Sequence, residues 1–182
     1  TYAPGLYDLT ELQRDANKRF GYSAKETLNI MQRLYENHKV LTYPRTDSRY
    51  IGTDVAETIK ERLKACAVGP YKKMAGSLSM KPVKTNGSFV DNKKVSDHHA
   101  IIPTEQFVQL EHMTVDERRI YDLVVRRFMA VLYPPFEYEQ TTMRGEAAGE
   151  TFVARGKIIK NQGWKEAYET PLDLEDDEEE EE

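Results

Sequence analysis

Cysteine is nearly absent from the sequence, and so are long apolar runs. The single Cys66 excludes an internal disulfide framework, and no Cys/His spacing is typical of a zinc site. Arg126 and Arg127 interrupt the longest apolar stretch, Tyr121–Phe136, so it is no membrane span. Residues Thr1–Pro4 contain no initiating Met and no signal pattern. We therefore expect a soluble protein of a reducing, cytoplasmic compartment, without a membrane partner, and a chain that is a piece of a longer one.

Basic residues outnumber acidic ones over most of the chain, although the whole sequence is acidic. It contains 26 Lys and Arg against 31 Asp and Glu. Nine of these acids lie in residues 173–182, so residues 1–172 carry 22 acids against 26 bases, a net charge of +4. Between Lys39 and Lys94 there are twelve basic residues and five acids. This segment predicts a polyanionic partner.

The first third of the chain has the pattern of two helices and a short strand. Capping boxes at Thr10 and Ser23 predict helices that end at Gly21 and near Asn37. The β-forming run Lys39–Tyr43 predicts a strand, which must end where Pro44 follows. Tyr43 is thus expected at a strand end.

A third helix is predicted over Thr53–Cys66, and the order helix, helix, strand, helix is typical of a winged-helix-like module. Residues 70–97 are lysine-rich and lack a sustained period, which predicts a long basic loop that could act as a wing. A capping box at Thr114 starts a fourth helix that ends before Pro134.

The last part of the chain has the pattern of strands. The Thr- and aromatic-rich runs Phe136–Met143 and Thr151–Ile159 predict a hairpin. The expected fold class is α+β: a mostly helical, winged-helix-like domain over residues 1–133, then a small β-rich segment over residues 134–172. Residues 173–182 should form a disordered acidic tail, because so many like charges repel one another.

One segment of ten residues, Leu41–Tyr50, concentrates groups that suit phosphate chemistry. They are a phenol, two guanidiniums and three other polar groups, namely Tyr43, Arg45, Arg49, Thr46, Asp47 and Ser48. A guanidinium near a phenol, whose pKa is ordinarily about 10, favours the ionised form and also neutralises a phosphate oxygen. Pro44 fixes the backbone between Tyr43 and Arg45, so both could face one phosphodiester. The alternative is that Tyr43 packs a strand edge and that Arg45, Asp47 and Arg49 form solvated ion pairs.

A second segment, Ser96–Thr104, contains two adjacent histidines. In an extended segment His98 and His99 point to opposite faces, so they cannot share a metal ion and only one can face a given site. Such a histidine can donate a hydrogen bond to phosphate. The alternative is an imidazole that is buried or solvated near a turn. No metal ligands are predicted in this chain.

These segments together resemble the type IA DNA topoisomerases, and most specifically their bacterial topoisomerase III branch. Five blocks that resemble this family occur in the family's order: Leu6–Asn17, Gly21–Lys25 with Leu34–Glu36, Thr42–Ser48, Ser96–Thr104 and Arg126–Phe128. The topoisomerase III branch is favoured by His99 and Ile102, because bacterial topoisomerase I has a glutamate and an arginine at these places.

The resemblance implies a catalytic role for Tyr43, which would attack one DNA strand and become joined to its 5′-phosphate. Arg45 would contact the scissile phosphate, and His98 would contact the DNA near it. Thr46, Asp47, Ser48 and Arg49 would surround these groups at the DNA. Residues 1–133 would then be the catalytic-tyrosine domain, and residues 134–172 a part of the arch, or gate, domain.

The resemblance also implies parts that this chain does not contain. Type IA enzymes bind Mg²⁺ through acidic residues of a Toprim domain, which we expect in the full-length protein together with its other domains. Single-stranded DNA is the implied substrate, the cytoplasm with its nucleoid the implied location, and this chain alone should be inactive. Two alternatives are a non-catalytic winged-helix DNA-binding module and a metal-dependent relaxase, which needs two histidines separated by one residue.

Overall fold

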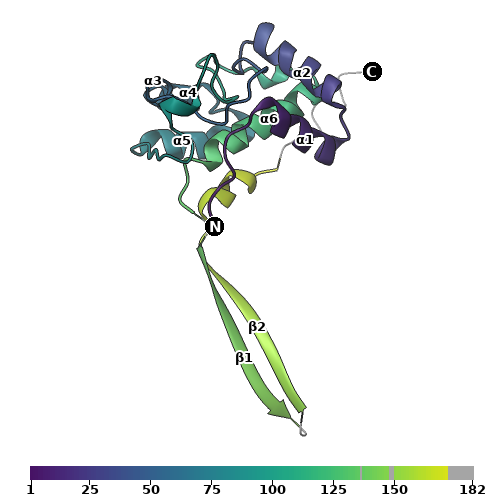
Figure 1. Cartoon of the computed structure of the whole chain (residues 1–182), viewed down its shortest axis with the longest axis vertical. Helices are drawn as coiled ribbons and strands as arrows, with labels where there is room; N and C mark the ends of the chain where they lie inside the picture. The colour runs from purple at the N-terminus through teal and green to yellow at the C-terminus, as the bar shows by residue number, and fades with distance from the viewer. Residues whose placement is uncertain (136, 148–149, 172–182) are drawn as a thin grey trace.

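A helical body with a long two-stranded hairpin projecting from it makes up the molecule (Figure 1). The computed structural model describes residues 1–135, 137–147 and 150–171, and only the backbone of residues 138–147 and 150–160. The predicted acidic tail lies outside the described residues. Within them, no helix is long and apolar enough to cross a membrane.

Helices α1 (Leu9–Phe20) and α2 (Ala24–Glu36) form an antiparallel pair at one side of the body. The predicted capping box of α2 is confirmed, since the Ser23 and Glu26 side chains each bond the other's backbone N–H. For α1 the prediction of Thr10 was wrong, because the side chain of Asp8 accepts from the Glu11 N–H. An aspartate caps a helix at least as well as a threonine, and Asp8 lies two residues before Thr10.

The predicted helix Thr53–Cys66 is interrupted. It consists of α3 (Thr53–Ala56) and α4 (Ile59–Ala65). Between them the Thr58 hydroxyl donates to the Val55 carbonyl at 2.7 Å. Such a local side-chain bond competes with the helical ladder, which explains the break.

Part of the predicted basic loop is helical, so that prediction was wrong. The 3₁₀ helix η1 (Gly69–Tyr71) leads into α5 (Lys72–Met80), whose residues Met74 and Ala75 are buried. The lysines around these apolar residues masked their helical spacing in the sequence. Residues 81–97, all of which the structure describes, contain only the short η2 (Asn92–Lys94) and one backbone bridge.

Helix α6 (Val115–Ala130) is the central element of the body. It follows the short η3 (Leu110–His112), and its predicted capping box, Thr114 with Glu117, is confirmed. It packs against α1, α2 and α5 and carries eleven buried residues. The core of the body therefore forms around this helix.

Arg126 and Arg127 of α6 are buried, and they fasten the two ends of the described chain to the body. Arg126 donates to the Ala167 carbonyl at 2.9 Å. Arg127 donates to the Gly5 carbonyl at 3.2 Å and pairs with Asp15 at 2.9 Å. These charges interrupt the apolar stretch of the sequence because they bind backbone and carboxylate groups inside the fold.

The predicted strand Lys39–Tyr43 is reduced to single backbone bridges, so this prediction was wrong in its extent. Leu41 pairs with Pro103, and Tyr7 pairs with Ile101. Pro103 has no N–H to donate, so the ladder cannot extend regularly through it.

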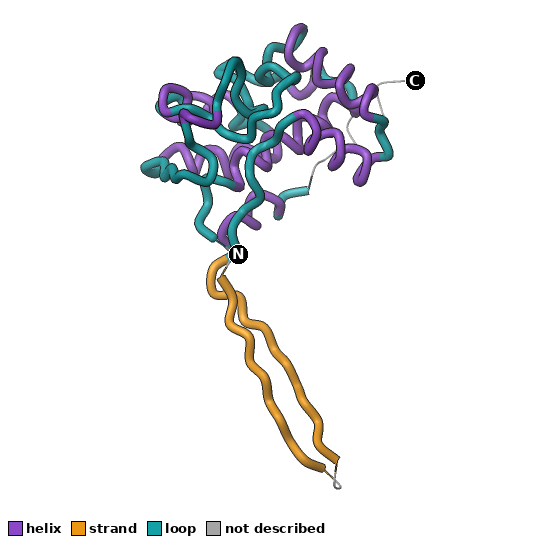
Figure 2. The backbone as a smooth tube through the Cα atoms, in the orientation of Figure 1, coloured by secondary structure: helices purple, strands orange, loops and turns teal. Residues whose placement is uncertain are grey.

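The predicted hairpin is confirmed, with strands longer than expected. Strands β1 (Glu137–Ala147) and β2 (Glu150–Asn161) are antiparallel (Figure 2). The chain then returns to the body as η4 (Gly163–Tyr168), which packs on α6. A mostly helical fold with few strands is therefore confirmed, while the winged-helix arrangement, the arch and the domain boundaries stay predictions.

Candidate functional site

The site forms where three chain segments that are distant in sequence are hydrogen-bonded together. The Leu9 N–H donates to the Thr46 carbonyl at 3.0 Å, which ties the start of α1 to the tyrosine loop, residues 42–50. The Thr42 N–H donates to the Ile102 carbonyl at 3.0 Å, which ties this loop to the histidine segment, residues 96–104. Backbone bonds thus fix the predicted site residues relative to one another.

Tyr43 lies between two other rings. Its ring stacks on His98 with the centroids 4.0 Å apart and an angle of 26°. Tyr35 from the last turn of α2 contacts it edge-on, at 5.6 Å and 82°. The two contacts restrict the rotation of the Tyr43 side chain, so its hydroxyl is held in a defined direction.

The two histidines face different surroundings. His98 is exposed and stacks on Tyr43, whereas His99 is half-buried. The Nδ1 atom of His99 lies 2.7 Å from the Ala100 carbonyl oxygen. Since a carbonyl only accepts, Nδ1 of His99 must carry the proton. Burial lowers the pKa of His99, and the nearby Arg62 guanidinium adds to this effect, so the ring is neutral at pH 7.

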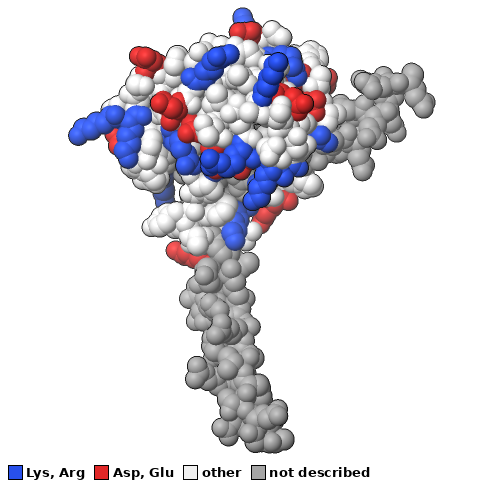
Figure 3. Space-filling view, turned by 45° about the vertical axis from the view of Figure 1, so that its right-hand side comes forward, with Lys and Arg blue, Asp and Glu red and all other residues white. Residues whose placement is uncertain are grey.

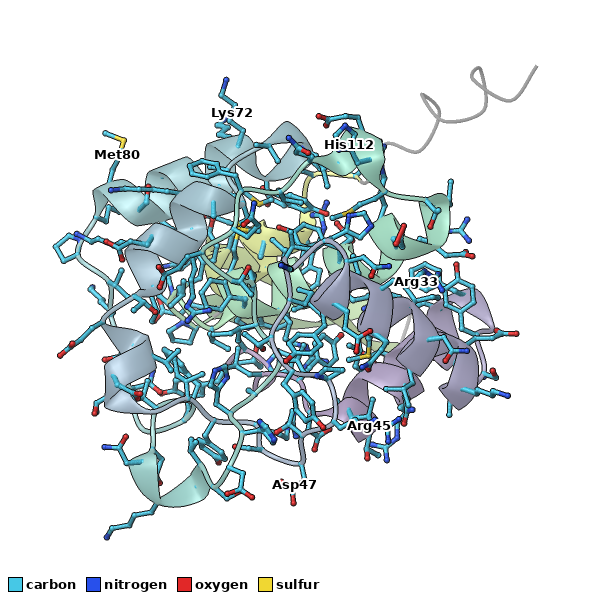
Figure 4. The ribbon with its side chains drawn as sticks, turned by 90° about the horizontal axis from the view of Figure 1, so that it is seen from above. Arg33, Arg45, Asp47, Lys72, Met80 and His112 are labelled. Atoms are coloured by element: carbon cyan, nitrogen blue, oxygen red, sulfur yellow. The ribbon has the colours of Figure 1, made fainter. Side chains whose placement is uncertain are left out.

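Arg45 lies at the rim of an open pocket of about 570 Å³ that starts beside His98. The pocket is also lined by polar groups of Thr10, Asp47 and Asp97. Figure 4 shows Arg45 and Asp47 at one edge of the body, on the opposite side from Lys72. Within the described chain, neither Arg45 nor Asp47 forms an ion pair or a side-chain hydrogen bond. The solvated ion pairs of the alternative interpretation are therefore not formed here, and the guanidinium is free to bind an anion.

Thr46, Ser48 and Arg49 use their polar groups inside the loop. The Thr46 hydroxyl accepts from the Ser48 N–H at 3.1 Å, and the Ser48 hydroxyl donates to the Lys94 carbonyl at 2.8 Å. Arg49 donates through Nε to the Leu6 carbonyl at 3.0 Å. In this structure these three side chains hold the shape of the tyrosine loop.

Charge on the body is mixed. On the face in Figure 3, Lys and Arg side chains are spread over the body with Asp and Glu between them. Among the described residues, no group of three or more His, Cys, Asp and Glu side chains could hold a metal ion. Arg45 and His98 line one pocket, and the Tyr43 ring stacks on His98.

The contact between Tyr35 and Tyr43 is not predictable from the sequence. The sequence places Tyr35 near the end of the second predicted helix, and this position gives no sign of its neighbour. The contact arises because the turn after α2 folds the chain back, with the Val40 N–H donating to the Leu34 carbonyl at 3.0 Å.

Comparison with known proteins gives one consistent result. A family model described as DNA topoisomerase matches residues 1–182. DNA topoisomerase 3 of Bacillus thuringiensis (strain Al Hakam) is 65% identical over 176 residues, which are 97% of this chain and 24% of that protein. DNA topoisomerase 3 of Bacillus subtilis (strain 168) is 52% identical over 180 residues, 99% of this chain and 24% of that protein.

Among solved structures, full-length topoisomerase I from Thermotoga maritima has a similar fold, with a TM-score of 0.64 over 94% of this chain and 28% of that one. Its sequence identity is 24%, so this likeness bears on the fold. The chain spans about 24% of the length of the Bacillus relatives. The resemblance predicted from the sequence is thus confirmed: this chain belongs to the DNA topoisomerase family, in its type IA branch, and is most like the bacterial topoisomerase 3 proteins.

Proposed function

We propose that the full-length protein cleaves and rejoins single DNA strands through a 5′-phosphotyrosyl intermediate on Tyr43, and so changes DNA topology. The observation that carries this proposal is the Tyr43 ring stacked on His98, at the edge of an open pocket whose rim holds the unpaired Arg45. The phenol thus stacks on a histidine that lines the same pocket as a free guanidinium, which supports the proposal.

In the proposed step, the Tyr43 oxygen loses its proton and attacks phosphorus, and the bond from phosphorus to the 3′ oxygen breaks. The 3′ oxygen takes up a proton, and the 5′-phosphate stays joined to Tyr43. The reverse step restores the strand, since one phosphodiester replaces another and no ATP is needed. An aryl oxygen is a good leaving group, which favours this return.

Arg45 would neutralise charge on the phosphate during both steps, because a free guanidinium can bind two phosphate oxygens at once. His98 would fix the Tyr43 ring and donate to a phosphate oxygen. Asp47 borders the same pocket, and Thr46, Ser48 and Arg49 would act at the DNA by keeping the loop in shape.

We assign no step to a metal ion in this chain. By the resemblance, Mg²⁺ would be held by a Toprim domain, and the other domains of the full-length protein would complete the strand-binding groove. Action on the DNA of the nucleoid would place the protein in the cytoplasm.

The test uses the full-length protein and a single-stranded oligonucleotide labelled at its 3′ end, quenched with denaturant in the presence of Mg²⁺. Wild type should give a labelled protein band, because the 3′-terminal fragment carries the bonded 5′-phosphate. Tyr43→Phe should bind the strand and give no band, whereas Tyr50→Phe, a control in the same loop, should give one. A band from Tyr43→Phe would overturn the proposal, and DNA binding without any wild-type band would favour the non-catalytic DNA-binding module.

A further inference from the structure

A second open hollow, of about 700 Å³, lies against Tyr43 and is distinct from the pocket that Arg45 lines. We call it the Lys39 hollow. Its walls come from the end of α2, the turn that follows, the tyrosine loop and the histidine segment. The residues that line it include Tyr35, Glu36, Lys39, Tyr43 and Thr104. Tyr43 is thus the wall that faces this hollow, while His98, stacked on Tyr43, lines the other.

Lys39 occupies a backbone position that suits glycine. Its φ is 57°, and within the described chain it is the one residue other than glycine with a positive φ. The conformation is fixed on both sides, because the Val40 N–H donates to the Leu34 carbonyl at 3.0 Å and the Thr104 hydroxyl donates to the Lys39 carbonyl at 2.6 Å. Glycine would adopt this conformation at lower cost, so the lysine side chain must be explained by something other than the backbone.

The Lys39 ammonium has no bonding partner within the described part of the chain. Lys39 is exposed, and its ammonium forms no hydrogen bond or ion pair with a described residue. The one carboxylate on the hollow, Glu36, accepts instead from the Gln32 side-chain amide at 2.8 Å. An unpaired cation therefore borders a space that is large enough for part of a ligand, beside the proposed nucleophile.

A DNA strand whose scissile phosphate lies at Tyr43 must continue on both sides of that residue. Tyr43 borders the Lys39 hollow on one side, and on the other side it stacks on His98, which lines the pocket of Arg45. The aromatic wall of Tyr35 suits a base or sugar, since every base has a face that packs on a ring. A lysine ammonium suits the next phosphate, because it is a compact charge with three donors.

We propose that the Lys39 hollow binds the nucleotide next to the cleaved bond, with the Lys39 ammonium on its phosphate and Tyr35 against its base or sugar. This inference rests on the proposed function, because it takes the strand to be DNA held at Tyr43. The carboxylate of Glu36 repels phosphate and so keeps the strand on the Lys39 side of the hollow. Lys39 is a binding residue in this account and takes no part in bond breaking.

The first experiment compares three variants of the full-length protein in binding a single-stranded oligonucleotide. Lys39→Gln should weaken binding about threefold to tenfold at low salt and reduce the slope of log Kd against log salt by about 0.7, the value for one phosphate contact on a single strand. Lys72→Gln changes an exposed lysine of α5, which lies on the opposite side of the body from Arg45 (Figure 4), and should leave both unchanged.

Lys39→Gly separates the charge from the backbone. If the Lys39 side chain binds DNA, this variant should bind DNA as weakly as Lys39→Gln. Its melting temperature should be unchanged or higher, because glycine adopts a positive φ without strain. Wild-type binding by Lys39→Gly would overturn the proposal, since the side chain would then have no role.

The second experiment neutralises single phosphates of the oligonucleotide with methylphosphonates, one position at a time. Wild type should lose affinity when the phosphate beside the cleaved bond is neutral, and Lys39→Gln should lose nothing further at that position. Equal losses in both proteins at every position would overturn the proposal. The protein band on wild type reports separately on the proposed function, so failure of the cleavage chemistry and failure of the Lys39 hollow give different results.

Discussion

His98 and His99 are neighbours in the chain, yet one ring stacks on Tyr43 and the other turns toward the Ala100 carbonyl. The extended backbone predicted that only one of them would face the site, because side chains alternate along such a segment. The stacking itself was not predictable, since it depends on how residues 42 and 102 pair across sixty residues of sequence.

The histidines therefore give a paired prediction. In the full-length protein, His98→Ala should abolish or strongly reduce the covalent adduct, because Tyr43 loses the ring that orients it. His99→Ala should largely retain it, since that ring is neutral and turned away. Adduct yield at fixed DNA concentration is the measurement, and the reverse pattern would contradict our assignment.

Arg45 gives a second prediction, which concerns the rate of cleavage. Removal of one charge that stabilises the transition state typically slows a reaction by about two to three decades. We expect Arg45→Ala to show such a loss in the single-turnover cleavage rate, with a much smaller loss in oligonucleotide affinity. Equal losses in rate and affinity would indicate a docking residue instead.

The remaining motif residues show why a motif is a poor guide to individual roles. Thr46, Ser48 and Arg49 carry the same kinds of groups as Arg45 and Asp47, but their donors and acceptors are used by backbone atoms of the Leu6, Lys94 and neighbouring segments. The partners of Ser48 and Arg49 are distant in sequence, so nothing local distinguishes a free guanidinium from a bonded one.

Elements with strong local signals were the predictable ones. The capping boxes of α2 and α6 were found because both partners lie within four residues, and the hairpin was found because its two runs flank a polar turn. Helix α5 was missed because its burial depends on distant elements, and the lysines around Met74 hid its apolar residues.

The capping box of α6 has an additional partner that gives a pH prediction. The Glu117 carboxylate accepts from the Thr114 N–H and contacts His38, both at 3.0 Å. Burial acts to raise the pKa of Glu117, but the Thr114 and His38 bonds outweigh it and the pKa is lowered. A lowered pKa means that ionised Glu117 stabilises the fold above its unfolded pKa of about 4.3, and that this contribution is lost as pH falls through the folded value.

We therefore expect Glu117→Gln, which keeps an acceptor for the Thr114 N–H but removes the carboxylate charge that contacts His38, to reduce the free energy of unfolding by roughly 0.5–1 kcal/mol at pH 7. The difference from wild type should shrink below about pH 4. Glu26→Gln, the same position in the exposed capping box of α2, is the control and should have a smaller effect. Urea unfolding at several pH values measures the free energy of unfolding of wild type and both variants. A difference between wild type and Glu117→Gln that grows in acid would contradict a stabilising role of ionised Glu117.

The chain as a whole contains the proposed nucleophile, but among its described residues no cluster of His, Cys, Asp and Glu could hold a metal ion. We expect this chain alone to bind single-stranded DNA weakly and salt-sensitively, with Kd on the order of 10⁻⁴ to 10⁻⁶ M, and to form no adduct. The measurement is the denaturant-quenched assay on the isolated chain with Mg²⁺, alone and with a separately made Toprim portion. A strong adduct from the chain by itself would show that its own groups suffice.

The hairpin joins the body through a base that has little freedom. Gly163 has a φ of +56°, and a Cβ atom there would lie 2.4 Å from the Pro134 carbonyl oxygen. The Trp164 N–H donates to that same oxygen at 3.0 Å, so both strands are anchored within a few residues of each other.

Seen mechanically, this arrangement is a lever with a short fulcrum and a long arm. Strand β1 has 11 residues, which at about 3.4 Å each gives an arm of roughly 37 Å. A rotation of only about 10° at residues 134 and 163 would displace the far end of an arm of this length by about 6 Å. A methyl group added at position 163 would therefore displace the far end of β1 much more than it displaces residue 163 itself.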